Sequence, residues 1–169
     1  MNLLEAIRTR RSIRKFLPKA VEKKDLQTML EAAMDAPSAL DEQPWQFIVM
    51  TESAMLQRLP EHHNHCDLVR GAPAAILICG DQSLEKLPGF WVQDCAACTQ
   101  NLLLAAHELG LGAVWVGVHP TPCNVNSLQT WLNLPDSVVP FALVAVGYPD
   151  EPYPEKINFK PERIHWNRW

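Results

Sequence analysis

Four short runs of apolar residues constrain the fold of this 169-residue chain more than any other feature of its sequence. Each run has the length and composition of a β-strand. The residues are continuously apolar rather than alternating with polar ones, which is typical of strands that are covered on both faces. The four runs are Gln46–Met50, Ala74–Cys79, Ala113–Val118 and Phe141–Val146. The sequence therefore predicts a sheet that lies between two covering layers.

Helical spacing of apolar residues predicts three helices around this sheet. The first ends near Thr9, the second stops before Pro37, and the third runs from about Val92 to Leu109. The third helix is apolar nearly all round, which is typical of a helix covered on every side, and we expect a partner subunit to share it. Because helices and strands alternate, we expect an α/β (α+β) fold: a three-layer α-β-α sandwich with a central mixed sheet.

The end of the chain has a different character, because four prolines interrupt residues 149–161 and exclude a compact element there. The same segment is rich in large apolar side chains, which need a surface to pack on. These are Ile157, Phe159, Ile164, Trp166 and Trp169. We expect residues 1–169 to form a single domain, with residues 150–169 as an extended tail that packs on the partner subunit.

Composition excludes several classes of protein. The chain contains no apolar run near the ~18 residues of a membrane span, and its N-terminus lacks the order of charges of a signal peptide. Five cysteines, an odd number, argue against a disulfide framework. We therefore expect a cytoplasmic protein that binds no membrane. The net charge of −4 does not favour binding to nucleic acid.

Two segments carry side chains suited to a binding site. Residues 10–16 read RRSIRKF and place three guanidinium groups and a hydroxyl close together, which matches the oxygens of a phosphate. The alternative is a solvated basic helix end, favoured by the helix dipole. Residues 36–45 read APSALDEQPW and form a stiff loop between a helix and a strand. Such a loop suits either function or a well-packed connection.

Taken together, these segments resemble the nitroreductase family. That family shows RRSIRKF after its first helix, an APSxxNxQPWxF-like loop that enters the first strand, and a GLGxxWxG-like turn after a buried helix. Here the loop reads APSALDEQPWQF, and the turn, GLGAVWVG, occupies residues 110–117. The basic, aromatic end KPERIHWNRW is also similar. The resemblance covers nearly the whole chain, in the same order.

The resemblance implies a homodimer that binds FMN, with these roles for single residues. Arg10, Arg11 and Ser12 would hold the phosphate, and Arg14 would face the pyrimidine edge of the flavin. Pro37, Ser38 and Ala39 would come from the other subunit and lie along the flavin ring, while Gln43 would support that loop or touch the ring. Trp115, Val116 and Gly117 would offer backbone groups, and Lys160 and Arg163 would reach the phosphate. Leu40 and Asp41 stand where the family often has Gly and Asn, so we expect Leu40 to narrow the substrate side and Asp41 to point away from the flavin.

The implied activity is that of an FMN-dependent oxidoreductase. NAD(P)H would reduce the flavin, and a nitroaromatic, a quinone or a related small acceptor would then take the electrons in a ping-pong scheme. No catalytic acid or base is expected, because the flavin carries the chemistry. A flavin-binding carrier or sensor without turnover is the alternative, and an anion or nucleic-acid binder that uses the basic N-terminus is a third possibility.

Two cysteine or histidine clusters need a separate interpretation. The HHNHC run at residues 62–66 resembles a metal site, but neighbouring histidines do not easily share one ion, so we expect a polar surface loop and no metal. Cys95 and Cys98 form a CxxC pair inside the apolar third helix rather than at a helix start, so we expect buried small hydrophobic residues and not a redox pair.

Overall fold

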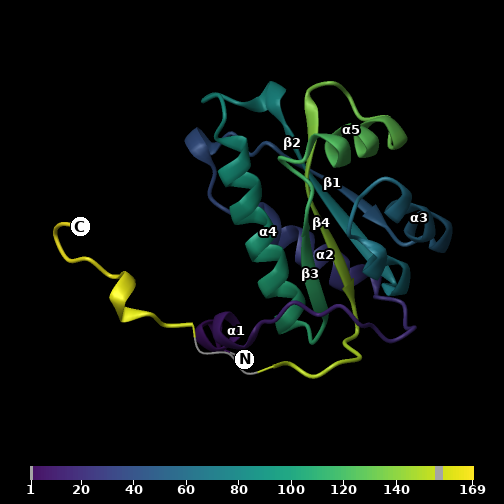
Figure 1. Cartoon of the computed structure of the whole chain (residues 1–169), viewed down its shortest axis with the longest axis horizontal. Helices are drawn as coiled ribbons and strands as arrows, with labels where there is room; N and C mark the ends of the chain where they lie inside the picture. The colour runs from purple at the N-terminus through teal and green to yellow at the C-terminus, as the bar shows by residue number, and fades with distance from the viewer. Residues whose placement is uncertain (1, 155–157) are drawn as a thin grey trace.

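The computed structural model describes residues 2–154 and 158–169, and Figure 1 shows how their elements are arranged. The strands are β1 (Trp45–Met50), β2 (Ala74–Asp81), β3 (Gly112–Gly117) and β4 (Val138–Gly147). The helices of more than one turn are α1 (Leu3–Thr9), α2 (Lys23–Met34), α3 (Ser53–Arg58), α4 (Trp91–Glu108) and α5 (Pro122–Trp131). The expected strands and three expected helices are confirmed, with ends shifted by a few residues. The sequence interpretation missed α3 and α5.

The four strands form one sheet in the order β1-β2-β4-β3, and each neighbouring pair is antiparallel. The expected mixed sheet is wrong in this respect, and the reason is the place of β4. Helix α4 connects β2 to β3 as a crossover between strands that run in the same direction, but β4 lies between them and pairs antiparallel with both. Among the described residues, parallel pairing is limited to the bridge between Ser12 and Ala113.

Both faces of the sheet are covered, which confirms the expected three layers. Helices α2 and α4 pack on the face that carries Ile76 and Ile78, while α3 and α5 pack on the face that carries Leu77 (Figure 1). Side chains of successive strand residues point to opposite faces, so one apolar strand supplies both cores. This explains why the four runs are apolar throughout.

Helix α4 is less completely covered than its composition predicts. The side toward the sheet and α2 is buried, whereas Ala97 and Leu104 on the outer side are half-buried, and Gln93 and Gln100 beside them are exposed. Within one chain, the outer stripe of α4 therefore remains open for further packing.

Residues 158–169 extend away from the body of the protein (Figure 1). Trp166 and Trp169 are 83% and 100% exposed, and Phe159 is 73% exposed. The expected apolar residue Ile157 lies outside the described residues. In residues 2–154 and 158–169, no helix combines the length and the apolar character that crossing a membrane requires.

Candidate functional site

Residues 10–16, which we call the basic segment, lie along the free edge of β3. Helix α1 begins with a capping box between Asn2 and Glu5, and its C-cap residue, Arg10, already has extended backbone angles. The N–H of Ile13 then donates to the C=O of Ala113 at 3.0 Å. Because the Ile13 side chain is fully buried, alternation along this extended segment turns Ser12 and Arg14 outward.

A cavity of about 300 Å³ opens at this place, and the basic residues share it with the start of the tail. Its lining comprises Pro154, Asn158 and four residues that we call the basic cluster: Arg10, Arg11, Ser12 and Arg14. The structure therefore brings together all four of the residues that were expected to face the phosphate and the pyrimidine edge.

The charges in this cavity are incompletely compensated. The Arg11 guanidinium donates to the backbone carbonyls of Pro154 and Arg8. Among the described residues, Arg10 and Arg14 form no ion pair, and the Arg14 guanidinium contacts only the C=O of Ser12, at 3.3 Å. Burial, followed by the neighbouring charge of Arg11, lowers the pKa of Arg10. Adjacent guanidinium groups fit a phosphate, because an anion relieves their mutual repulsion and can accept N–H groups from them.

Backbone donors of the same segment already hold an anion. The carboxylate of Glu151 accepts the N–H groups of Arg14 and of Lys15, the latter at 3.2 Å. Residues 148–154 run beside the basic segment in this way, through an antiparallel bridge between Phe16 and Pro149. The start of the tail is thus part of the wall of the cavity.

A buried histidine, not singled out from the sequence, supports this end of α1. The Thr9 hydroxyl donates to the C=O of Glu5 at 2.7 Å, so it accepts from Nε2 of His107 at 2.8 Å. Burial, followed by the charge of Arg10, lowers the pKa of His107, which favours the neutral ring. The signal in the sequence was a histidine near the end of an otherwise apolar helix.

The open edge of β3 offers backbone groups beyond the basic cluster. Since the C=O of Ala113 faces this edge, alternation places the N–H and C=O of Trp115 and Gly117 on the same side and those of Val116 toward β4. His63 Nε2 lies 2.9 Å from the carbonyl oxygen of Gly117. Of the three expected backbone contributors, Trp115 therefore presents its N–H and C=O at the open edge, Gly117 presents its N–H there while its C=O lies against His63, and the backbone groups of Val116 face β4.

The loop of Pro37, Ser38 and Ala39 lies at the opposite end of α4. The N–H of Ala39 donates to Asp94 Oδ1 at 3.0 Å, in the first turn of α4, whereas His107 beside the basic cluster is in its last turn. Thirteen residues at 1.5 Å per residue separate these two positions by about 20 Å. One chain therefore does not bring the two halves of the predicted site together.

Within this loop, Gln43 has a structural role. Its side chain donates to Asp41 Oδ1 at 2.8 Å, and its backbone N–H donates to the Ser38 hydroxyl oxygen at 3.0 Å. Of the two roles left open for Gln43, the structure shows support of the loop. The Asp41 carboxylate is turned toward Gln43.

Comparison with known proteins agrees with this arrangement. The model of the Nitroreductase family matches residues 7–148, which run from the last residues of α1 to just past the end of β4 and include the basic segment, the loop and β3. The chain belongs to the nitroreductase family.

Individual known proteins resemble the chain over most of their length. A protein of Methanothermobacter thermautotrophicus, provisionally named NADH dehydrogenase/NAD(P)H nitroreductase, is 49% identical over 169 residues, covering 100% of this chain and 88% of that protein. A provisionally named NADH oxidase of Clostridium acetobutylicum has a solved structure with a TM-score of 0.94 and 38% identity, covering 97% of this chain and 99% of that one. A provisionally named nitroreductase of Desulfovibrio desulfuricans, solved in complex with FMN, has a TM-score of 0.86 and 33% identity, covering 100% and 99% of the two chains.

Lys160 and Arg163 are exposed residues of the tail in this nitroreductase-family chain. They do not line the cavity of the basic cluster, although Asn158 does. Within one chain, Lys160 and Arg163 thus lie outside the group of residues that line this cavity.

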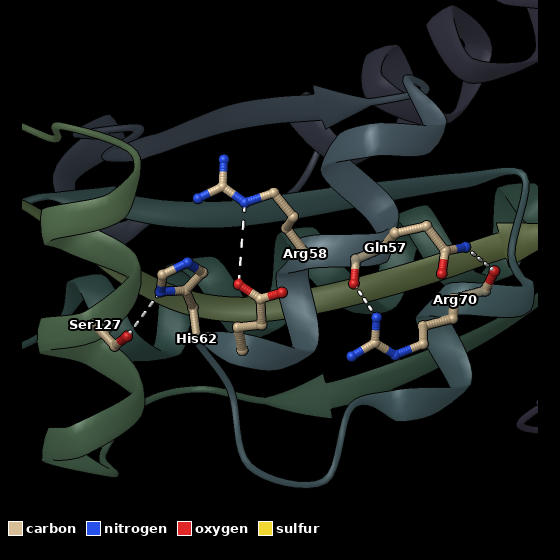
Figure 2. Close-up of polar contacts among 6 residues, drawn as sticks. Gln57, Arg58, His62, Arg70 and Ser127 are labelled. Atoms are coloured by element: carbon tan, nitrogen blue, oxygen red, sulfur yellow. Dashed lines mark hydrogen bonds and ion pairs between the residues drawn. The ribbon is translucent and has the colours of Figure 1, made fainter.

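Of the histidines in residues 62–66, His62 points toward Ser127 of α5 (Figure 2), whereas His63 lies beside the carbonyl oxygen of Gly117. His62 Nδ1 lies 3.1 Å from the Ser127 hydroxyl oxygen, and its ring stacks on Trp131 with 4.4 Å between centroids. Among the described residues, no group of three His, Cys, Asp or Glu side chains is placed to hold a metal ion. The expected polar surface loop is wrong for His63 and Cys66, which are buried, because this segment packs against α5 and the end of β3.

Cys95 and Cys98 are free and fully buried, as expected for packing residues. Burial raises the pKa of the Cys98 thiol to about 12 and also raises the pKa of Cys95. Neither thiol is therefore ionised near neutral pH, which removes the thiolate that redox exchange requires.

Proposed function

We propose that this protein is an FMN-dependent NAD(P)H oxidoreductase that reduces a nitroaromatic, a quinone or a related small acceptor in a ping-pong scheme. The observation that carries the proposal is the cavity at the edge of β3, which Arg10, Arg11, Ser12 and Arg14 line together and in which Arg10 and Arg14 form no ion pair with another described residue. The FMN complex of the Desulfovibrio desulfuricans neighbour supports the choice of cofactor.

The residues present fit FMN. Arg10, Arg11 and Ser12 would hold its phosphate, and the open edge of β3 would offer Trp115 and Gly117 to its ring system. When bound, FMN takes two electrons from NAD(P)H and gives them to an acceptor. Arg14 would place a cation at the pyrimidine edge, where it stabilises the negative charge that reduction brings. The protein thus supplies orientation and electrostatics, and no side chain of this chain is assigned as an acid or base.

The assembly proposed with this function is a homodimer. Pro37, Ser38 and Ala39 stand about 20 Å from the basic cluster along α4, so they would serve the flavin of a second copy. The exposed apolar residues of α1, the outer stripe of α4 and the tail would be buried at the same time. In this assembly residues 150–169 would pack on the partner, and Lys160 and Arg163 would reach the phosphate.

Two measurements on the purified protein test the proposal. Mass spectrometry of the ligand released by heat should identify FMN, and anaerobic addition of NADH or NADPH should bleach the yellow protein. A flavin that resists both nicotinamides but remains bound would instead favour a carrier or sensor. FAD, or no flavin after reconstitution with excess FMN, would overturn the proposed cofactor. The cytoplasmic location stays a prediction.

A further inference from the structure

Two buried carboxyl groups lie beside the start of α4: Glu42, from the loop of residues 38–43, and Asp94, from the first turn of α4. Asp94 is 5% exposed and Glu42 is 6% exposed. Asp94 Oδ1 accepts the N–H of Ala39 at 3.0 Å, and Glu42 Oε2 accepts the N–H groups of Lys86 at 2.7 Å and Leu87 at 3.2 Å. The two remaining oxygens, Asp94 Oδ2 and Glu42 Oε1, are buried and have no other donor among the described residues.

The two carboxyl groups are neighbours, because each is among the causes that shift the pKa of the other. One proton between them would give both remaining oxygens a partner, and Asp94 is the better place for it. The N–H groups of residues 86 and 87 favour ionised Glu42 and lower its pKa, whereas burial, together with the neighbouring Glu42, raises the pKa of Asp94. With the proton on Asp94, its carboxyl group would donate to Glu42, which already accepts the N–H groups of Lys86 and Leu87.

The loop above this pair has a conformation that its own residues do not favour. Leu40, Asp41 and Gln43 have φ values of 47°, 52° and 45°, in the left-handed region that side chains with a Cβ rarely adopt. Leu40 is 62% exposed, so burial of its side chain does not compensate for this strain. Lys86 Nζ donates to the C=O of Leu40 at 2.8 Å and lies 3.3 Å from that of Asp41. Strained segments persist where the surrounding contacts over-determine them.

We propose that Glu42 and Asp94 share one proton and, together with Lys86, act as positioning residues that fix the loop which covers the flavin of the second copy. The assignment of the loop to a flavin rests on the proposed function. The pair does not touch the flavin; it acts by holding the backbone of residues 38–43. Above the pH at which the shared proton is lost, two carboxylates face each other in a buried site and the loop loosens.

Other charged groups face the pair from the surrounding elements. Glu85 adds a negative charge that raises the pKa of Asp94 further, although its own carboxylate accepts the N–H of Gly89 at 2.6 Å. Lys86 supplies the opposing positive charge. On the sheet side, the ring of His119 meets that of Trp91, the first residue of α4, edge-on at 4.8 Å, and Cys79 of β2 lies beside Cys95. A pH dependence must therefore be read against a variant that lacks the proton on Asp94 itself.

The experiment compares Asp94→Asn with Asp94→Ala and with Asp67→Asn, a control at an exposed acid on a different part of the surface. Asparagine keeps the acceptor for Ala39 and permanently replaces the shared proton with an N–H donor. Thermal unfolding is followed from about pH 4, near the ordinary pKa of Asp, to pH 8. Because the pKa of Asp94 is raised in the folded protein, the wild type should lose stability as the pH rises through this window. The Tm of Asp94→Asn minus that of the wild type should therefore be at least about 2 °C larger at pH 8 than at pH 4.

Hydrogen exchange at neutral pH gives the second readout, on protein without added flavin. The amides of Ala39 and Gln43 should exchange at least about tenfold faster in Asp94→Ala than in the wild type, and Asp94→Asn should restore protection. A Tm difference that is constant with pH, or equal protection in all variants, would overturn the shared proton. In FMN-loaded enzyme, Asp94→Ala should raise the KM for the acceptor more than it lowers kcat, with rescue by Asp94→Asn. A wild type that binds no FMN would overturn the proposed function, but the unfolding and exchange results would still decide the proposal about the pair.

Discussion

Replacing Gly112 with alanine tests the contact that holds the basic segment against β3. A Cβ built at Gly112 would lie 2.7 Å from Ile13 Cγ2 and 2.8 Å from Ile13 Cβ. Real Cβ atoms essentially never approach other heavy atoms within 3.0 Å. Because Ile13 is fully buried and its own Cβ is involved, a change of rotamer does not relieve the clash, and the backbone has to move.

The expected cost follows from this overpacking. Extra atoms in a well-packed core cost about 1–3 kcal/mol, and in a chain of this size each kcal/mol lowers the Tm by about 2–4 °C. The displaced segment also carries Ser12, which bridges to Ala113, so the donors of the cavity should shift with it. FMN binding should therefore weaken by about tenfold or more, in addition to the loss of stability, since a lost charge-assisted hydrogen bond costs about 1.5–3 kcal/mol.

Urea unfolding and flavin titration of the Gly112→Ala protein measure the two effects. Gly71→Ala is the matched control, because a Cβ there meets nothing within 4 Å, and we expect its stability and affinity to remain near those of the wild type. Wild-type stability and FMN affinity in Gly112→Ala would show that Ile13 does not fix the basic segment. Packing against β3 would then not be what positions the residues of the cavity.

Three further predictions concern the cofactor, the cysteines and the assembly. Arg10→Ala and Ser12→Ala should each weaken FMN binding by about 1.5–3 kcal/mol in a fluorescence titration of the apoprotein. Unchanged affinity in both variants would favour the alternative that the basic segment is only a solvated helix end. Replacing Cys95 and Cys98 together with alanine should cost about 1–2 kcal/mol of stability and leave flavin reduction near wild type; loss of reduction with a normal flavin spectrum would indicate a redox pair. Deleting residues 155–169 should weaken dimerisation and FMN binding together, as judged by light scattering and flavin titration, and a change in only one of them would separate the tail from the site.

The sequence was sufficient for the four strands and for the residues of the basic cluster. Four continuous apolar runs predicted strands covered on both faces, and the RRSIRKF motif predicted that Arg10, Arg11, Ser12 and Arg14 act together, which agrees with their shared cavity. Strand order could not be derived in this way, since hydrophobicity does not say that β4 inserts between β2 and β3. That insertion is why the sheet is antiparallel where a mixed sheet was expected.

The missed elements had weak or misread signals. Helix α5 is short and rich in Asn, Ser, Gln and Thr, so its apolar spacing is faint, although Pro122 at its first position is a typical start. The sequence analysis missed Asp94 because the apolar residues around it suggested that this helix serves packing alone. A carboxylate among alanines and cysteines must be paired or protonated when buried, and this rule would have pointed to the pair with Glu42.

The most direct test of the central claim measures flavin content and oligomeric state on the same purified sample. Light scattering gives the mass in solution, and absorbance with mass spectrometry of the released ligand gives the amount and identity of the flavin. We expect a dimer with two FMN molecules, bleached by NADH or NADPH in the absence of oxygen and restored by a quinone. A monomer at micromolar concentration that holds FMN tightly would contradict a site completed by loop 38–43 of a second copy.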